Sequence, residues 1–506
     1  MLALKTLIFD GMAAREISVQ VQLSGGLADK KEPFKIVGLA DKTVSESKER
    51  IRGALYSMNL SLPTQKITVN LAPADIEKNG SSFDLPILCA LLSAMGALKA
   101  EKLSRYIILG EVGLDGAILP TSAVLPASVF ALKNGYGIIC PFDNGAEARW
   151  AGGNDILAPK HILQLVNHFR GTQILPLPAK TIPAQARRAE TDFSEVLGQQ
   201  MAKRAMEIAA AGGHAVLMTG PPGAGKTMLA ARLPSIMPDM TATEILETSM
   251  LYSIAGSLRG LITDRPVRKV HHSASAAALA GGGANAKPGE ISLAHNGVLF
   301  LDELPEFGRQ TLEILRQPME AGEILISRAK RNATYPARFQ LVAAMNPCPC
   351  GHLKNPKLSC SKAPRCAEAY QAKISGPLLD RIDLHVEVEA AEPWKEGGQK
   401  SEPSAKIRER VVAARSRQSE RSLRFFGREI LNAHLDGKFL DAAAPLDESS
   451  LAMLNNAAEK LGLSARGYNR IKRVARTISD LRGALNIEAC DIAESLSYRP
   501  VSRGKF

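Results

Sequence analysis

The sequence predicts an α/β protein with more than one domain, and three observations lead to this prediction. Short apolar runs alternate with helical patterns as far as residue 393, which is typical of layered α/β folds. A glycine-rich loop at residues 220–227 lies between an apolar run and a helix-forming segment, the context of a nucleotide-binding parallel sheet. The patterns after residue 404 are mostly helical. A chain of 506 residues also exceeds what one hydrophobic core usually supports.

The chain divides into three predicted domains. Residues 1–172 are expected to form a self-contained α/β domain. Residues 173–190 contain several prolines and no clear period, so we expect an extended linker there. Residues 191–393 hold the nucleotide motifs on strands separated by helices, and residues 404–506 are expected to form a C-terminal helical lid.

Composition favours a soluble protein with a polyanionic partner. The chain has 63 Lys and Arg residues against 51 Asp and Glu residues, a net charge of +12, which favours partners such as nucleic acid. It contains no apolar run of about 18 residues, the length that indicates a membrane-spanning helix. Its N-terminal residues lack the basic flank and long apolar core of a secretion signal. We therefore expect a cytoplasmic location.

The glycine-rich loop is the most informative motif. Its glycines let backbone N–H groups surround phosphates, the Lys226 ammonium reaches the terminal phosphates, and the Thr227 hydroxyl holds Mg²⁺. The residues expected to surround the nucleotide are Gly220, Pro221, Pro222, Gly223, Ala224, Gly225, Lys226, Thr227, Met228 and Asp302. The predicted cofactors are therefore ATP and Mg²⁺.

Two further apolar runs end in polar residues that phosphoryl transfer needs. The first is followed by Asp302, which would hold Mg²⁺, and by Glu303, which would polarise the attacking water. The second ends at Asn346, which would orient that water or contact the γ-phosphate; the alternative is an ordinary strand-ending Asn. Arg381 ends a helical segment, and an exposed guanidinium there suits a phosphoryl group in transfer. If a neighbouring subunit supplied it, hydrolysis would depend on assembly.

The order of these motifs resembles that of AAA+ ATPases, and three segments narrow the resemblance. Residues 192–199, 288–297 and 344–351 are similar to those of the ComM (YifB) family, in the magnesium-chelatase-like branch, and the similarity covers nearly the whole chain. The resemblance implies a homohexameric ring that acts as an ATP-dependent helicase. Such a ring would drive branch migration while incoming single-stranded DNA recombines with the chromosome in natural transformation. The implied partners are single-stranded and branched DNA, further copies of the chain and recombination proteins.

The resemblance also implies roles for three polar residues. Arg381 matches the arginine finger that acts on a neighbouring subunit, and Asn346 matches the first sensor residue. Arg466 matches a lid arginine that contacts the γ-phosphate within its own subunit, although Arg470 and Arg473 lie nearby at helical spacing. The alternative for this group is a basic helix face. The predicted catalytic set is Lys226, Glu303, Asn346, Arg381 and Arg466.

A basic hairpin is predicted over residues 321–339. Two β-prone runs flank a short tip of basic and small residues, and the resemblance implies that this hairpin projects into the pore of the ring. Arg328, Lys330 and Arg331 would then contact DNA phosphates without reading the base sequence. The alternative is a basic tip that only keeps the protein soluble.

Four cysteines crowd into residues 348–366. Cys348, Cys350, Cys360 and Cys366 could supply four thiolates to a structural zinc ion, which would stabilise a segment too small to form its own core. Crowded cysteines in a chain expected to be cytoplasmic favour a metal over disulfides. Cys348 and Cys350 are separated by one residue, whereas zinc sites more often have two residues between paired cysteines. The alternative is that the four cysteines are free thiols and bind no metal.

Two segments of the first domain, residues 75–86 and 109–120, resemble the Lon-type protease domain. That enzyme uses a serine activated by a lysine. Ser82 falls at the nucleophile position, but Leu125 stands where the lysine belongs, and Lys133 lies eight positions further on. We therefore expect a Lon-like domain without proteolytic activity, which serves as a ring scaffold or contacts DNA.

Three functions compete at this stage: a DNA motor, a chelatase-type ATPase that remodels a partner protein, and an ATP-dependent protease. The basic hairpin and the positive net charge favour the first over the second, because a protein-remodelling motor needs no polyanionic track. Leu125 weakens the third.

Overall fold

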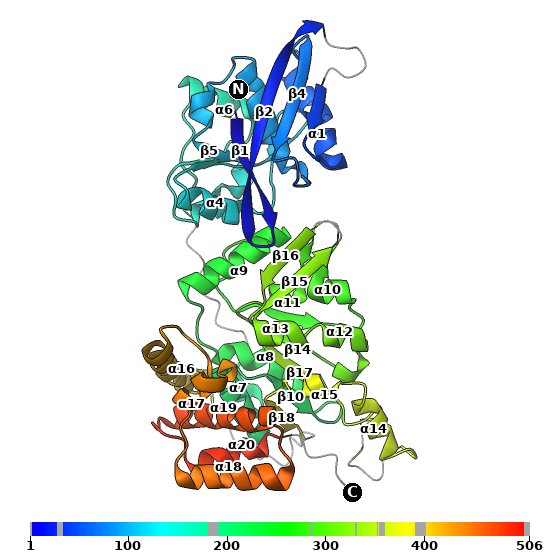
Figure 1. The fold of residues 1–506 in the computed structure, drawn as a ribbon, viewed down its shortest axis with the longest axis vertical. Helices are drawn as coiled ribbons and strands as arrows, with labels where there is room; N and C mark the ends of the chain where they lie inside the picture. The colour runs from blue at the N-terminus through cyan, green and yellow to red at the C-terminus, as the bar shows by residue number, and fades with distance from the viewer. Residues whose placement is uncertain are drawn as a thin grey trace.

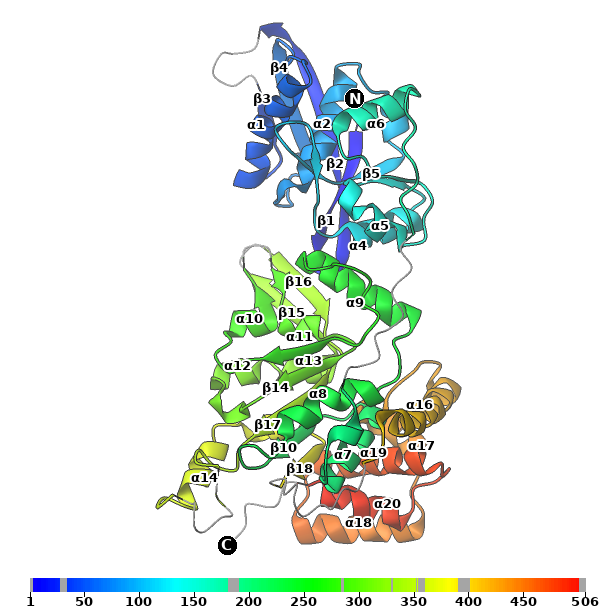
Figure 2. The same ribbon diagram turned by 180° about the vertical axis from the view of Figure 1, so that it is seen from behind.

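The computed structural model arranges the chain in three parts along one axis (Figure 1, Figure 2). It describes residues 3–27, 34–180, 191–283, 286–328, 331–351, 353, 360–389 and 401–499. The N-terminal domain lies at one end, the domain with the glycine-rich loop in the middle, and the helical domain at the other end. This is the predicted α/β fold class with a parallel core sheet and a helical C-terminal region. No helix in these described ranges has the length and apolar character needed to cross a membrane.

The N-terminal domain is built on a seven-stranded sheet with the order β3-β4-β2-β1-β5-β8-β9. β1 and β2 pair antiparallel, and β5, β8 and β9 continue the sheet in parallel. The apolar helix α2 is buried over most of its length and fills the core of this domain. The strands are β1 (Ala3–Asp10), β2 (Ala13–Leu27), β3 (Phe34–Val37), β4 (Gln65–Ala72), β5 (Tyr106–Ile108), β6 (Glu111–Val112), β7 (Ile118–Leu119), β8 (Gly137–Ile139) and β9 (Ile156–Leu157). The helices are α1 (Lys42–Ser57), α2 (Asp84–Ala94), α3 (Ala100–Leu103), α4 (Val124–Lys133), α5 (Gly145–Arg149) and α6 (Ile162–Arg170). In the predicted linker, residues 173–180 have no regular secondary structure, and residues 181–190 lie outside the described ranges.

The middle domain contains a parallel five-stranded sheet with the order β11-β14-β17-β10-β18. β14 and β17 are buried at every position, as expected for strands covered by helices on both faces. The strands are β10 (Val216–Thr219), β11 (Val267–Val270), β12 (Gly281–Gly282), β13 (Lys287–Pro288), β14 (Val298–Leu301), β15 (Glu323–Arg328), β16 (Arg331–Pro336), β17 (Gln340–Met345) and β18 (Leu384–Glu387). The helices are α7 (Gln200–Gly212), α8 (Lys226–Ile236), α9 (Ala242–Ala255), α10 (Ala276–Ala280), α11 (Glu290–Leu293), α12 (Arg309–Glu313), α13 (Arg316–Ala321), α14 (Arg365–Gln371) and α15 (Gly376–Leu379).

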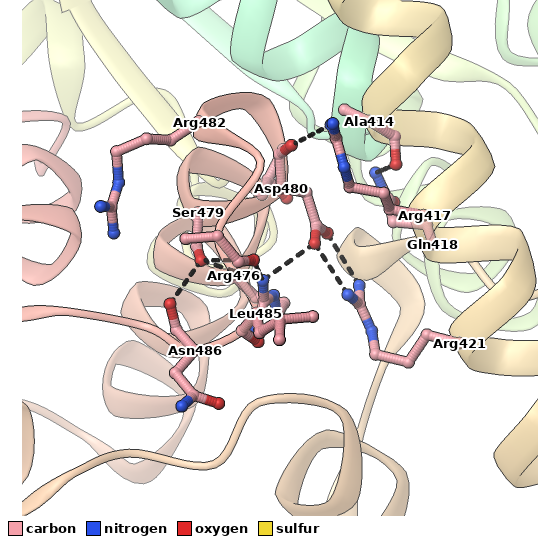
Figure 3. Close-up of polar contacts among 12 residues, drawn as sticks. Ala414, Arg417, Gln418, Arg421, Arg476, Ser479, Asp480, Arg482, Leu485 and Asn486 are labelled. Carbon is pink, nitrogen blue, oxygen red and sulfur yellow. Dashed lines mark hydrogen bonds and ion pairs between the residues drawn. The ribbon is translucent and has the colours of Figure 1, made fainter.

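The helical domain is held together by a buried carboxylate, Asp480 (Figure 3). Its elements are α16 (Ser404–Phe426), α17 (Gly437–Ala443), α18 (Glu448–Leu461), α19 (Ala465–Arg482) and α20 (Ala489–Ser497). Asp480 accepts two 2.7 Å hydrogen bonds from Arg421 on α16 and one of 2.9 Å from Arg476 on its own helix. Asn432 donates a fourth at 2.8 Å. These bonds compensate the buried charge and fix α16 against α19.

A second buried network joins the helical domain to the parallel sheet. His214, two positions before the first residue of β10, is fully buried. Its Nδ1 lies 2.9 Å from Asp383, directly before β18, and its Nε2 lies 2.7 Å from Thr477 on α19. Burial acts to raise the pKa of Asp383, but the His214 hydrogen bond and nearby arginines outweigh it and hold the pKa at about 2. Arg415 on α16 adds two hydrogen bonds to the Ala210 carbonyl of α7. The helical domain is therefore docked at the amino ends of β10 and β18.

The N-terminal domain contacts the middle domain at two places (Figure 1, Figure 2). The β1–β2 turn lies against the hairpin formed by β15 and β16: Gly11 has a φ of 65°, and a Cβ atom there would lie 2.2 Å from the Thr334 carbonyl oxygen. At the second place, Ser253 of α9 donates a 2.5 Å hydrogen bond to Glu147 of α5. The Ser253 carbonyl also accepts from Ala123 N at 3.0 Å.

Removing the Asp480 carboxylate should strongly destabilise the helical domain. Asp480→Ala leaves Arg476 buried without its counter-charge, so we expect a loss of about 3–5 kcal/mol in the free energy of unfolding. The matched control is Asp441→Ala in the same domain, whose carboxylate is 74% exposed and pairs with Lys472; about 1 kcal/mol or less is expected. Urea unfolding followed by circular dichroism measures both, and equal losses would contradict the assigned role of Asp480.

Candidate nucleotide site

The candidate site is a cleft of about 450 Å³ at the carboxyl ends of β10, β14 and β17. Because these strands are parallel neighbours, the loops that follow them meet at one edge of the sheet. The lining residues are Pro222, Gly223, Ala224, Gly225, Lys226, Thr227, Met228, Asp302, Glu303, Met345 and Asn346. The structure thus brings together three segments that are far apart in the chain.

The loop between β10 and α8 adopts a conformation that depends on glycine. Gly223 and Gly225 have φ values of 76° and 86°, in the left-handed region that a Cβ atom disfavours. Gly220 lies close to the backbone of Val388, the residue that follows β18. A Cβ atom at Gly220 would lie 2.1 Å from the Val388 carbonyl oxygen. The loop leads directly into α8, so the helix N-terminus faces the cleft and favours an anion there.

Lys226 connects the loop to the neighbouring strand. Its Nζ donates to the carbonyl oxygens of Gly220 and Pro221 at 2.7 and 2.9 Å, and to Asn346 Oδ1 at 3.1 Å. Burial lowers the pKa of the Lys226 ammonium, and the charges of Asp302 and Glu303 oppose that shift. The predicted phosphate-binding lysine and the predicted sensor asparagine are therefore in direct contact.

Two oxygen ligands suited to Mg²⁺ lie side by side. Thr227 Oγ1 donates to Asp302 Oδ2 at 3.0 Å, and both residues line the cleft. A hydroxyl and a carboxylate beside a phosphate site match the oxygen-rich coordination that Mg²⁺ prefers. The residues present therefore fit the predicted ion, which would neutralise phosphate charge when bound.

Glu303 is held in a strained backbone conformation at the edge of the cleft. Its φ and ψ are 54° and 48°, in the left-handed region that is uncommon for non-glycine residues. Its Oε2 lies 3.2 Å from Nδ1 of His272, which follows the edge strand β11. These two residues could not be connected from the sequence alone, because their contact depends on the pairing of β11 with β14.

The two predicted arginines do not line this cleft; they share a carboxylate elsewhere. Arg381 bonds Glu320 through Nη2, and Arg466 Nη2 lies 3.7 Å from the same Glu320 oxygen. Arg381 is predicted to be exposed, but its side chain is only 11% exposed and pairs with Glu320. The predicted contact of Arg466 with its own subunit's γ-phosphate stays a prediction. Arg466 lies in the first turn of α19, and Thr477, eleven residues further along the same helix, contacts His214 at the amino end of β10.

Comparisons with known proteins agree with this architecture. The family profile "Magnesium chelatase, subunit ChlI" matches residues 192–395, "Subunit ChlI of Mg-chelatase" matches residues 19–144, and "Magnesium chelatase, subunit ChlI C-terminal" matches residues 401–499. The chain is 42% identical over 501 residues to the competence protein ComM of Haemophilus influenzae, covering 97% of this chain and 96% of that protein. The protein YifB of Escherichia coli is also 42% identical, with the same coverage.

The chain belongs to the ComM/YifB family. Identity at this level over nearly the full length of both proteins means that the whole domain arrangement is shared with the family. The likeness to a magnesium-chelatase 38 kDa subunit of Cereibacter sphaeroides is more distant, with 25% identity over 39% of this chain. Nucleotide and Mg²⁺ use follow from the magnesium-chelatase-like family.

The hairpin predicted over residues 321–339 is present in this family member as β15 and β16. Six residue pairs form its antiparallel register, from Glu323 opposite Pro336 to Arg328 opposite Arg331. Lys330 lies outside the described residues, and so do the side chains of Arg328 and Arg331. Their contacts with DNA therefore stay a prediction.

The four predicted zinc ligands form two pairs. Cys348 Sγ lies 3.2 Å from Cys350 Sγ, and Cys360 Sγ lies 3.4 Å from Cys366 Sγ. Within the described ranges, no three His, Cys, Asp or Glu side chains are arranged as a metal site. A zinc ion would require the two sulfur pairs to open into one tetrahedron.

The prediction that the N-terminal domain lacks proteolytic activity rests on Leu125, which is fully buried on α4. An apolar side chain cannot activate the Ser82 hydroxyl. Lys133 lies in the last turn of α4 and is exposed. The Leu125 amide instead donates to Glu147 at 3.0 Å, which caps the start of α4. The position that would hold a catalytic base thus serves the packing of this helix.

Glu303→Gln should bind ATP but hydrolyse it about 10²–10⁴-fold more slowly, because an amide cannot accept the proton of the attacking water. The matched control is Glu306→Gln, since Glu306 lies in the same loop, pairs with Lys373 at 3.3 Å and does not line the cleft. Nucleotide binding by fluorescence and phosphate release separate the two steps. If Glu303→Gln hydrolysed ATP at the normal rate, Glu303 would not be the general base.

Proposed function

We propose that this chain is a cytoplasmic, ATP-driven DNA motor that promotes branch migration while single-stranded DNA is integrated by homologous recombination in natural transformation. The observation that carries the proposal is the cleft in which Lys226, Thr227, Asp302, Glu303 and Asn346 meet, because these groups supply what phosphoryl transfer requires. Similarity to a relative named competence protein supports DNA uptake as the process. The net charge of +12 supports a polyanionic track.

The DNA contacts that we propose lie at the tip of the hairpin. The register brings Arg328 opposite Arg331, and Lys330 lies between them in the sequence. Three basic residues at one turn would bind phosphates of a single strand without base specificity.

The motor that we propose is a homohexamer in which neighbouring copies share each nucleotide. Arg381 and Arg466 do not line the cleft of their own chain and lie together at Glu320. A pair of guanidinium groups at that position suits the phosphates of a nucleotide bound to the next copy in a ring. In this proposal Arg466, like Arg381, acts on the nucleotide of a neighbouring copy.

The second candidate function is a chelatase-type ATPase that remodels a partner protein. The three family profiles, which carry the name of a magnesium chelatase subunit and together match most of the chain, favour it. Such a motor would hydrolyse ATP at a rate independent of DNA. An ATP-dependent protease is the least favoured, because Leu125 stands in place of the required base.

Single-stranded DNA should stimulate ATP hydrolysis severalfold at low salt, and the stimulation should fall steeply as salt rises, because phosphate binding releases counterions. The purified protein should also drive strand exchange on three-way and four-way junctions. Replacement of Arg328, Lys330 and Arg331 by Ala should abolish stimulation while unstimulated hydrolysis persists. Hydrolysis unchanged by DNA at low salt would instead favour the protein-remodelling function.

We also propose that the cysteine pairs close around a structural zinc ion. The support is the proximity within each pair, 3.2 Å for Cys348 and Cys350 and 3.4 Å for Cys360 and Cys366. Metal analysis of the purified protein should find about one zinc per chain, and Cys360→Ser should lower it. Cys490→Ser, which alters an exposed cysteine elsewhere, should leave it unchanged. Less than about half an equivalent in the parent protein counts against zinc.

A further inference from the structure

A second cleft, of about 460 Å³, lies beside Arg381 and contains the carboxylate of Glu320, at the end of α13. The Arg381 guanidinium is held from two sides there. Its Nη1 donates to the Pro377 carbonyl oxygen at 2.7 Å, and its Nη2 donates to Glu320. Its Nε is buried and has no partner among the described residues. The head of this side chain is therefore fixed by two anchors, of which Glu320 is the only charged one.

Glu320 also reaches the second arginine. Arg466, from the start of α19, places Nη2 3.7 Å from the same oxygen that Arg381 contacts. Two guanidinium groups repel each other, and a carboxylate between them offsets that repulsion. Glu320 thus joins a residue of the middle domain to a residue of the helical domain.

The exposure of the three side chains differs in a way that suits an incoming anion. Arg381 is 11% exposed, whereas Glu320 and Arg466 are 54% and 62% exposed. The buried arginine cannot search many rotamers, so less side-chain entropy is lost when it binds a phosphate. The open side of the cluster remains accessible to a neighbouring molecule.

We propose that Glu320 is a positioning residue that holds Arg381 and Arg466 as a pair for the terminal phosphates of a nucleotide bound to a neighbouring copy of this chain. The inference rests on the proposed function, because it needs a site shared between copies. Glu320 touches no substrate in this scheme. It acts through the two arginines, and its loss leaves both guanidinium groups present but no longer fixed.

Mixed assemblies test this proposal with full-length chains. One component is Lys226→Ala, which cannot bind nucleotide and can only donate arginines. The other is Arg381→Ala, which binds nucleotide but depends on a neighbour's arginine. Mixing them should restore part of the ATP hydrolysis that each lacks alone. Adding Glu320→Ala to the donor, the Lys226→Ala chain, should lower the restored rate at least about tenfold. This is a part of the roughly 10³–10⁵-fold increase in kcat that an arginine finger contributes.

The internal control places Glu320→Ala in the Arg381→Ala chain, which binds the nucleotide, and not in the donor. Glu320→Ala combined with Arg381→Ala should leave the restored rate unchanged, because that component contributes no finger at the active interface. Glu313→Ala in the donor should also leave it unchanged, since Glu313 lines the same cleft but pairs with Arg316 at 2.6 Å.

Each other outcome overturns the inference. Equal losses with Glu320→Ala in either component indicate a role in folding or assembly alone. A higher rate with the altered donor indicates that Glu320 competes with phosphate for Arg381, and an unchanged rate shows that it does not position the arginine. Absence of recovery with the two parent components removes the shared site itself, which is a failure of the proposed function.

Discussion

The parallel pairing of β10, β14 and β17 is the constraint on which the nucleotide site depends. Thr219 lies opposite Met345, and Leu301 lies opposite Ala343, so the three strands end at nearly the same level. The residues that follow them are therefore neighbours although the chain separates them widely. Lys226 contacts Asn346, and Thr227 contacts Asp302, only because of this register. A shift of any strand would separate the metal ligands from the phosphate loop.

The opposite ends of the same strands carry the helical domain. His214 precedes β10 and Asp383 precedes β18, and the hydrogen bonds from His214 to Asp383 and to Thr477 attach α19 there. This anchor lies at the end of the strands opposite the nucleotide cleft. Arg466, in the first turn of α19, lies beside Glu320 of the middle domain.

Sequence patterns predicted most of the fold and the loop site, because both depend on local order. A strand, a glycine-rich loop and a helix are consecutive, so the position of Lys226 could be predicted without knowledge of the fold. The contact of His272 with Glu303 could not, since it requires β11 to pair with β14. The partner of Arg381 was missed for a similar reason: Glu320 lies 61 residues away in the chain. The resemblance implies a role for Arg466, but its contact with Glu320 could not be predicted, because it depends on how α19 packs against the middle domain.

The contacts of the N-terminal domain link it mechanically to the nucleotide-binding domain. Glu147 bonds Ser253 on α9, which follows the phosphate-loop helix α8 in the chain. The β1–β2 turn at Gly11 packs on Thr334, in the hairpin that connects β14 to β17 through the chain. Both contact points lie in segments that follow a strand of the nucleotide cleft in the chain: α9 follows β10 and α8, and the hairpin follows β14. A change in the cleft that displaces α9 relative to the hairpin must therefore also move or strain the N-terminal domain. Because Gly11 leaves no room for a Cβ atom, even a small displacement at the turn changes a backbone contact.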